Sequence, residues 1–245
     1  MKSILLFILI TITSLHAIDI KVAVAANVSY AIDELVKEFN RTNQNTDVKV
    51  ILGSSGKLTA QIKHGAPYQL FMSANMKYPN ALYKENIAVT KPLVYAQGSL
   101  AFFSAKKLDF SKSIELLKAK SIKKIAIANP KTAPYGKAAV EAFKSAKIFK
   151  TIEKKLIYAE SISQSVSYAI TAADMGVIAK SALYSEKMSK FKKGANWKEL
   201  DPKLYTPIKQ GIVMLENSKE VKAFYDFILS KKAKEIFQKY GYITE

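Results

Sequence analysis

The stretch TDVKVILGSSGKLTAQIKHG (residues 46–65) joins a strand pattern directly to a helix pattern through two consecutive serines. Alternating apolar and β-branched residues over 46–53 predict a strand, and the helix-like spacing that follows ends at Gly65. The turn between them holds Ser54 and Ser55, so both hydroxyls are expected at the carboxyl end of a strand. This stretch decides the fold because a strand followed at once by a helix is the first half of a strand–helix–strand unit.

The segments on either side continue the same alternation. IDIKVAVAA (18–26) predicts the strand before it, and NVSYAIDELVKEFN (27–40) predicts an amphipathic helix with Asn27 as its N-cap. YQLFMSA (68–74) predicts the strand after it. Three strands alternating with two helices predict a parallel sheet with right-handed crossovers.

A second alternating series follows further along the chain. Its strand-like and helix-like runs are SLAFFSA, SIELLKA, KKIAIANP, YGKAAVEAFKSAKIF, KKLIYAE, SISQSVSYAITAAD and MGVIAKSAL, followed by a late strand in YTPIKQGIVML and two C-terminal helices. The chain is expected to cross between the units near 92–104 and 206–215. The sequence thus predicts an α/β protein of two lobes, each a mostly parallel sheet flanked by helices. Residues 18–96 plus 208–245 form lobe I, residues 97–207 form lobe II, and a ligand is expected in the cleft between them.

The first 17 residues, MKSILLFILITITSLHA, have the features of an export signal. Lys2 precedes an apolar stretch that is too short to span a bilayer, and Ala17 supplies a small residue at the cleavage site. The chain contains no cysteine, which excludes disulfides, a thiolate metal site and lipid attachment through an N-terminal cysteine. The mature protein is expected to be exported and soluble, and neither inserted in a membrane nor lipid-anchored.

The formal net charge of +18 is compatible with binding to nucleic acid or to an acidic surface. Among the 38 basic residues, however, Arg41 is the single arginine, and the lysines are dispersed along the chain. Nucleic-acid sites favour arginine because its planar fork matches phosphates and base edges. The charge therefore favours a solvated surface over a nucleic-acid partner. His64 is the single histidine after the signal, so no site for a free metal cation is expected.

The serine turn admits three chemical interpretations. A phosphate loop requires glycine at the position of Ile51 and a serine or threonine at that of Leu58, so it fails twice. A Ser-x-x-Lys acyl enzyme would use Ser54 and Lys57, although the Ser-Asp-Asn and Lys-Thr-Gly partners are missing. In an anion site, the hydroxyls and the N–H groups of the first helical turn would donate hydrogen bonds. The alternative to all three is that the serines only cap the helix.

The anion site gains support because the feature recurs. Asn27 follows the first strand, Tyr135-Gly136 follows the strand in KKIAIANP, and Ser161-Ile162 follows the strand in KKLIYAE. Parallel strands bring such turns to one edge of each sheet. Four turns from two lobes are thus expected to face one cleft with their N–H donors, and a small multivalent anion fits such a place.

The strings AANVSYAIDELVKEF, GSSGKLTAQIKHGAPYQLFMSA, VKAFYDFILS and AKEIFQKYGY together resemble the periplasmic molybdate/tungstate-binding proteins of ABC transporters, from about Lys21 to Tyr242. The resemblance implies a two-lobed periplasmic binding protein fold that closes on a tetrahedral oxyanion held by uncharged donors. It implies a monomer that is not an enzyme and needs no cofactor. Such a protein acts in the periplasm and delivers molybdate or tungstate to an inner-membrane permease.

The resemblance also implies the ligand-binding positions. The residues that match the family's motifs are Asn27, Ser54, Ser55, Tyr135, Ile162, Gly136 and Ala179. Asn27 stands where the family has a serine, and Ala179 stands where some members have a tyrosine whose hydroxyl reaches the ligand. Molybdenum or tungsten is bound only as the oxyanion.

Three alternatives stay open. The first is a binding protein for another tetrahedral oxyanion, such as sulfate or phosphate. The second is a secreted serine acyl enzyme that uses Ser54 and Lys57. The third is a basic protein that binds nucleic acid or a charged surface.

Overall fold

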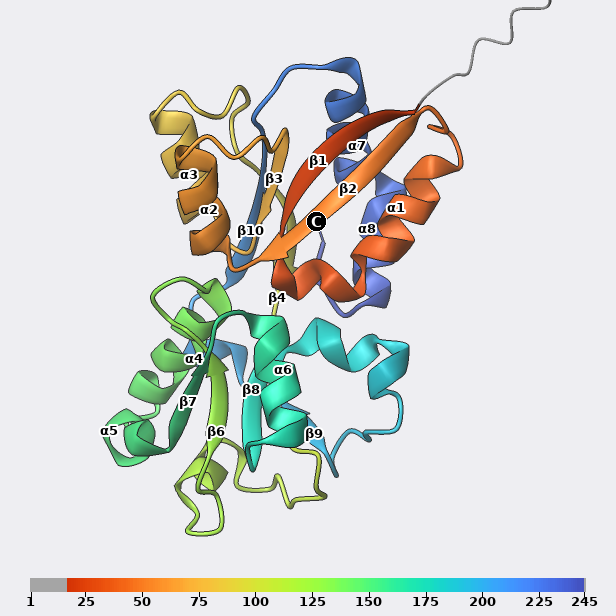
Figure 1. The fold of residues 1–245 in the computed structure, drawn as a ribbon. Coiled ribbons are helices and arrows are strands. Elements are labelled where there is room, and N and C mark those ends of the chain that lie inside the picture. Colours follow the sequence, from red (N-terminus) through yellow and green to blue (C-terminus); the bar gives the residue numbers. More distant parts are fainter. Residues whose placement is uncertain (1–16, 245) are drawn as a thin grey trace, which may run out of the picture.

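The computed structural model describes residues 17–244, so the predicted export signal over 1–17 lies outside the described residues except for Ala17. The chain forms two lobes, each built on one five-stranded sheet, and Figure 1 shows one lobe above the other. The predicted fold class, α/β with two lobes, is confirmed. Within residues 17–244, none of the helices has the length and apolar character needed to cross a bilayer.

The first sheet has the strand order β2-β1-β3-β10-β4. Its strands are β1 (Ile18–Ala25), β2 (Thr46–Gly53), β3 (Leu70–Ser73), β4 (Leu93–Gly98) and β10 (Ile208–Met214). β1 pairs in parallel with β2 and β3, as the strand–helix–strand pattern predicts, because a helix returns the chain to the same end of the sheet. β10 pairs antiparallel with β3 and β4, so the sheet is mixed.

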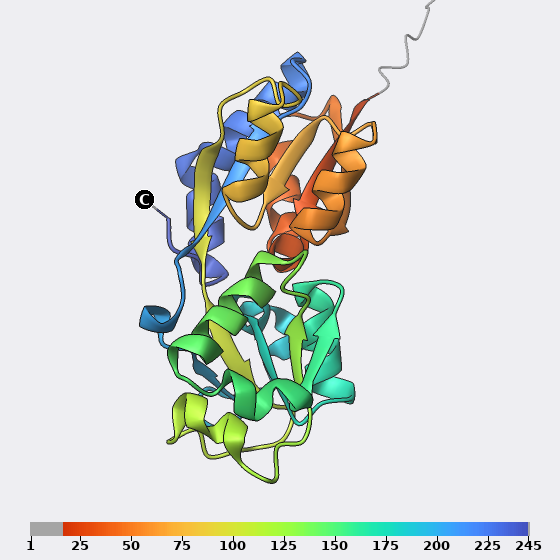
Figure 2. The ribbon, with the colours of Figure 1, turned by 90° about the vertical axis from the view of Figure 1, so that its left-hand side faces the viewer.

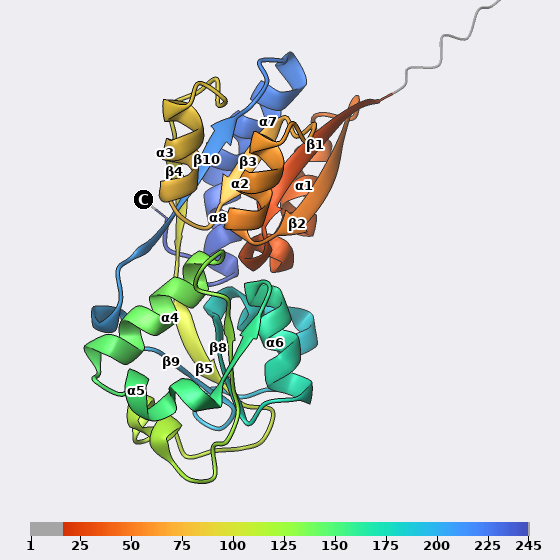
Figure 3. The same ribbon diagram turned by 60° about the vertical axis from the view of Figure 1, so that its left-hand side comes forward.

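Helices cover both faces of this sheet (Figure 3). The helices are α1 (Ile32–Asn40), α7 (Lys219–Leu229) and α8 (Lys231–Lys239) on one face, and α2 (Ser55–Lys63) and α3 (Lys77–Lys84) on the other. On the first face the rings of Phe39 and Phe224 meet edge to face, with their centroids 5.0 Å apart. On the second face Leu58 and Leu82 pack with Phe71 of β3.

The second sheet has the strand order β7-β6-β8-β5-β9. Its strands are β5 (Leu100–Phe103), β6 (Ile125–Ala128), β7 (Leu156–Ala159), β8 (Met175–Ala179) and β9 (Trp197–Glu199). β6 pairs in parallel with β7 and β8, and β5 pairs antiparallel with β8 and β9. The helices are α4 (Pro134–Ser145) and α5 (Phe149–Ile152) on one face and α6 (Ile162–Thr171) on the other.

Two adjacent segments carry the chain between the lobes, and Figure 2 shows them along one side of the molecule. β4 of the first sheet leads through Ser99 into β5 of the second, and residues 205–207 lead back to β10. β4 keeps its pairing with β10 as far as Gly98, two residues beyond the predicted end of the first lobe I segment at 96. The lobe boundaries stay predictions. Because β4 belongs to the first sheet up to Gly98, its pairing supports a first crossing between the lobes slightly later in the chain than residue 96.

Several local elements differ from the prediction. Asn27 is not the N-cap of the first helix, because a short 3₁₀ helix, η1 (Ala26–Tyr30), precedes α1. SIELLKA forms a 3₁₀ helix, η2 (Ser113–Lys118), instead of a strand or an α-helix. The short elements α3 and β9 were not predicted at all. A further 3₁₀ helix, η4 (Lys180–Tyr184), follows β8 and contacts η1 of the other lobe.

Candidate functional site

Five strand-to-helix turns, the four expected ones and that between β3 and α3, meet at a small cavity between the lobes, called here the interlobe cavity. Its volume of about 10 Å³ is roughly the room that one water molecule needs. The residues that line it are Ala25, Ala26, Asn27, Gly53, Ser54, Ser55, Ala74, Ala133, Pro134, Tyr135 and Ile162. None of these residues carries a charge, so any anion held here would be bound by neutral groups.

Five of the seven predicted ligand-binding positions line the cavity, namely Asn27, Ser54, Ser55, Tyr135 and Ile162. The other two are buried elsewhere. A Cβ added to Gly136 would lie 2.0 Å from the carbonyl oxygen of Ala128, so this glycine lets α4 approach β6 closely. Ala179 pairs with Leu100 inside the second sheet and belongs to its core.

The serine turn supplies two hydroxyls that differ in their hydrogen bonds. Ser54 is the N-cap of α2, but its side chain makes no capping hydrogen bond. Its Oγ is buried and has no hydrogen-bond partner anywhere in the described part of the chain. The Oγ of Ser55 accepts a hydrogen bond of 2.9 Å from the backbone N–H of Ala74. The Ser55 proton therefore stays available for a second partner, since a hydroxyl can accept and donate at once.

Asn27 is fully buried in η1, and its amide is held by groups that lie far away in the sequence. Its Nδ2 donates to Oε1 of Gln210 at 2.7 Å and to the hydroxyl of Tyr242 at 3.0 Å. Its backbone oxygen accepts from the hydroxyls of Tyr242 and Ser181. Its Oδ1, in contrast, has no partner within residues 17–244. A buried polar atom without a partner is costly, so it marks a place where a ligand or water belongs.

Gln210 links the lobes behind the cavity and was not predicted. It lies in β10, is fully buried, and accepts a hydrogen bond of 2.7 Å from the hydroxyl of Tyr95. Its Nε2 donates to the hydroxyl of Tyr135 at 3.2 Å. The signal that could have identified it is a polar residue that alternates with the apolar Ile208 and Ile212 in a predicted strand. Buried polar side chains are retained mainly where they have partners.

The electrostatics of this network keep its groups neutral. Burial raises the pKa of the Tyr242 phenol to about 12, and it raises the pKa values of Tyr95 and Tyr135 well above the ordinary range. All three hydroxyls therefore keep their protons at any physiological pH. Within the described residues, no group of three or more histidine and carboxylate side chains is placed to hold a metal ion.

The Tyr242 pKa predicts a loss of stability in alkali. Its folded pKa of about 12 lies above the ordinary value of 10.0, so the neutral phenol stabilises the fold fully below pH 10.0. This contribution, about 2 to 3 kcal/mol, is lost as pH rises toward the folded pKa. Denaturant titrations above and below pH 10.0 measure it. Tyr242→Phe should show a smaller alkaline loss than the wild type, and an equal loss would contradict the assignment.

Direct contacts between the lobes lie next to the serine turn. The backbone N–H of Gly56 donates to the carbonyl oxygen of Thr132 at 2.9 Å. Lys57 Nζ pairs with Glu160 Oε1 at 2.5 Å, and both side chains are about half exposed. Because Lys57 points to Glu160, it does not serve as a base for Ser54. Among the described residues, the acyl-enzyme alternative therefore lacks the lysine base that would activate Ser54.

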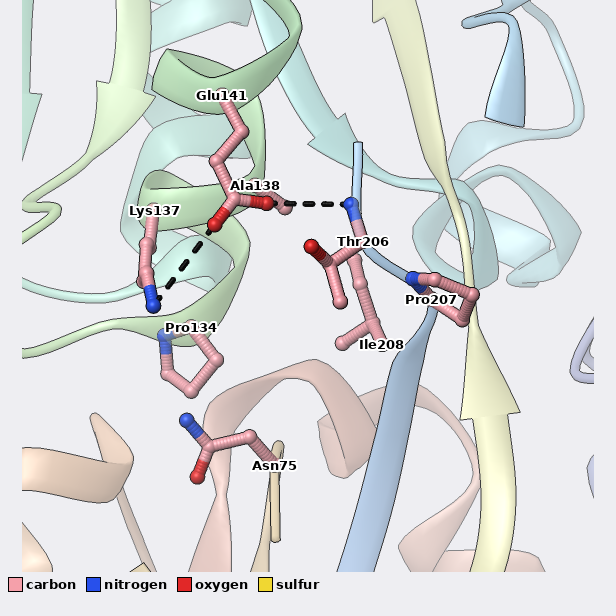
Figure 4. Close-up of a pocket in the computed structure, with 8 residues that line it drawn as sticks. All are labelled: Asn75, Pro134, Lys137, Ala138, Glu141, Thr206, Pro207 and Ile208. Atoms are coloured by element: carbon pink, nitrogen blue, oxygen red, sulfur yellow. Dashed lines mark hydrogen bonds and ion pairs between the residues drawn. The ribbon is translucent and has the colours of Figure 1, made fainter. Parts of the chain in front are cut away.

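A second hollow of about 110 Å³ lies beside the site, next to the segment that leads into β10 (Figure 4). One basic side chain, Lys137, lines this hollow, and its Nζ lies 3.8 Å from Oε1 of Glu141. The Glu141 carboxylate also accepts a hydrogen bond from the backbone N–H of Thr206. An anion gains little there because the carboxylate already neutralises the lysine. The interlobe cavity, with its free hydroxyls, is the better candidate.

The chain is similar to known proteins over nearly the whole of its described length. The family model described as bacterial extracellular solute-binding protein matches residues 20–243. The chain is 36% identical to the molybdate-binding protein ModA of Rhodobacter capsulatus, over 93% of this chain and 89% of that protein. It is 34% identical to ModA of Azotobacter vinelandii, over 93% and 90% of the two chains.

Solved structures show the same similarity. The periplasmic molybdate-binding protein of Azotobacter vinelandii superposes with a TM-score of 0.84 at 28% identity, covering 92% of this chain and 99% of the other. The sulfate-binding protein SubI of Mycobacterium tuberculosis superposes with a TM-score of 0.72 at 14% identity, covering 92% and 86%. At that low identity the second match shows a shared fold alone.

Proposed function

The chain belongs to the bacterial extracellular solute-binding proteins, and on that premise we propose that it captures molybdate in the interlobe cavity. It is a binding protein and not an enzyme, like the relatives that it matches. The observation that carries the proposal is the hydroxyl of Ser54, which is buried at the cavity without a hydrogen-bond partner. A buried donor in this position costs stability unless a ligand uses it.

The donors of the cavity suit a fully ionised tetrahedral dianion. Such an ion offers only acceptors, so its partners must all be donors. Ser54, Ser55 and Tyr135 each have a hydroxyl proton that no described acceptor occupies. The first turns of α2, α4 and α6 add N–H groups and the positive ends of helix dipoles. No acidic side chain lines the cavity to repel the ion.

Capture is proposed to occur by closure of the lobes around the ion. The cavity has walls from both lobes, and the Gly56–Thr132 and Lys57–Glu160 contacts join the lobes next to the serine turn. The cavity has room for about one water molecule, so a larger oxyanion needs the lobes to move apart, and its binding is coupled to a hinge movement at the two crossing segments. We further propose that the protein acts as a monomer in the periplasm, also binds tungstate, and delivers its ligand to an ABC-transporter permease.

The test of this function is the variant Ser54→Ala. The change removes an unpaired buried hydroxyl, so the free energy of unfolding should stay the same or rise slightly. Molybdate binding should weaken by about 10- to 150-fold, because a hydrogen bond to a charged ligand contributes about 1.5 to 3 kcal/mol. Calorimetric titration with molybdate, tungstate, sulfate and phosphate measures both the affinity and the ligand class.

Ser218→Ala is the matched control. The Ser218 hydroxyl caps α7 by accepting a hydrogen bond from Val221, far from the cavity. Its loss should lower stability by about 1 kcal/mol and leave binding unchanged. If Ser54→Ala behaves like this control, the cavity is not the binding site. If sulfate or phosphate binds the wild type more tightly than molybdate, the site is right and the proposed ion is wrong.

A further inference from the structure

Gly98 is the last residue of β4, and it pairs with Ile208 of β10 just before the chain crosses to lobe II. A glycine weakens a strand because it has no side chain to pack, and it often marks a place where another group approaches closely. Its backbone does not require a glycine, since the left-handed φ values among the described glycines belong to Gly65, Gly194 and Gly241. The reason for a glycine at position 98 therefore lies in the space beside it.

That space is filled by the phenol of Tyr135, which belongs to the other lobe. A Cβ added to Gly98 would lie 1.8 Å from the Tyr135 hydroxyl oxygen and 2.8 Å from the ring carbon that carries it. Tyr135 lies in the first turn of α4, which packs on the second sheet. Its hydroxyl oxygen also lies 3.2 Å from Nε2 of Gln210 in β10. The phenol of lobe II thus reaches both strands of lobe I at the point where the chain crosses.

The Tyr135 ring has no room to avoid a side chain at position 98. It is 1% exposed and packs in one apolar cluster with Ala26 and Ala74 of lobe I and Ile162 of lobe II. A flip of the ring does not help, because the hydroxyl oxygen lies on the axis of that rotation. A methyl group at position 98 must therefore push Tyr135, and with it the first turn of α4, away from lobe I.

We propose that Gly98 is a positioning residue, which leaves open the seat of the Tyr135 phenol and so lets the first turn of α4 close on the oxyanion. The inference rests on the proposed function and adds the residue that sets how far the lobes close. Tyr135 lines the cavity, and the first turn of α4 supplies N–H groups beside it. The seat consists of protein groups alone, so it favours the closed arrangement before an ion binds as well as after.

The variant Gly98→Ala tests this role in a double-mutant cycle. In the wild-type background, molybdate affinity should fall by about 5- to 150-fold, because the added methyl group overpacks the closed arrangement. In a chain that carries Tyr135→Ala the phenol is gone, and Gly98→Ala should change the affinity by less than about twofold. The remaining close neighbour is Gln210 Nε2, the end of a flexible side chain that can withdraw. An equal fold-change in both backgrounds overturns the proposal.

Gly211→Ala is the matched control, because it adds the same methyl group to β10 directly after Gln210. Its Cβ would lie 2.7 Å from the sulfur of Met76 and 3.0 Å from Cγ of Pro79, and both residues belong to lobe I. The control should lower the melting temperature and leave the affinity and the separation of the lobes unchanged. If it weakens binding as much as Gly98→Ala does, crowding of the crossing strands explains the effect and the seat of Tyr135 does not.

Spin labels on the two lobes provide a test that needs no ligand. The sequence contains no cysteine, so Lys84→Cys in α3 and Lys150→Cys in α5 create two labelling sites at exposed positions. In the free protein, Gly98→Ala should shift the distance between the labels to longer values, and it should have no such effect when Tyr135→Ala is also present. Equal distances with and without Gly98→Ala overturn the seat. If the wild type does not bind molybdate but the distances still lengthen, the proposed ligand is wrong and the positioning role stands.

Discussion

Replacing Asn27 by aspartate is expected to abolish molybdate binding at neutral pH. The aspartate places a negative charge in a fully buried position that lines the cavity, directly beside the proposed dianion. It also cannot donate to Gln210 or to Tyr242, so two hydrogen bonds of the network are lost. An uncompensated buried charge costs about 3 to 5 kcal/mol, which corresponds to a loss of affinity of more than about 100-fold.

The same substitution should make stability depend on pH. Burial and the absence of a cation raise the pKa of an aspartate at position 27 above its unfolded value. The neutral form then stabilises the fold at acidic pH, and this contribution is lost as pH rises through the raised pKa. Melting temperatures at acidic and neutral pH, with titrations under the same conditions, measure both effects.

Asn45→Asp is the matched control, because Asn45 is exposed in the loop before β2. It adds the same charge outside the cavity and should leave affinity and pH dependence as they are in the wild type. Wild-type affinity of Asn27→Asp at neutral pH would show that Asn27 does not approach the ligand.

Replacing Gly136 by alanine should destabilise the protein strongly. The new Cβ would lie 2.0 Å from the carbonyl oxygen of Ala128 and 2.6 Å from its carbon, and both are backbone atoms that no side-chain rotation can move. Overpacking of this kind costs about 3 kcal/mol. For a chain of this size, that loss lowers the melting temperature by roughly 6 to 12 °C.

Lys137→Ala, at the next position of α4, is the control, because its side chain is 67% exposed. It should change the melting temperature little. Molybdate affinity distinguishes two consequences of Gly136→Ala: displacement of α4 also displaces Tyr135, so the affinity should fall with the stability. A stable variant with wild-type affinity would show that α4 can move away from β6 without cost.

The turns around the cavity could be predicted from the sequence because their positions follow from local order. A parallel strand that leads into a helix places its first helical residues at the carboxyl edge of the sheet. Ser54, Ser55, Tyr135 and Ile162 follow this rule, and the structure places all four at one cavity. Whether they bind the ion is a prediction that the titrations test.

The features of the site and the fold that the sequence did not predict depend on contacts between distant residues or on short elements. Asn27 follows a strand as an N-cap does, but partners 183 and 215 residues away determine its role. Gln210 and Tyr242 belong to the network for the same reason. Helix α3 contains Pro79, which a sequence pattern treats as a helix breaker, although proline is tolerated in the first turn. Strand β9 has three residues, too few for a periodic pattern.

The hydrogen bonds of Tyr242 to Asn27 have a consequence for biosynthesis. A ribosome makes Asn27 early and Tyr242 late, and all residues that line the cavity lie between positions 25 and 162. The first lobe can build its sheet only after β10 has emerged, and Asn27 is held in place only after Tyr242 has followed. A nascent chain that stops before this tyrosine has every cavity-lining residue but lacks the group that fixes one of them. The network that holds Asn27 is therefore completed only after residue 242 has been made, long after the cavity-lining residues.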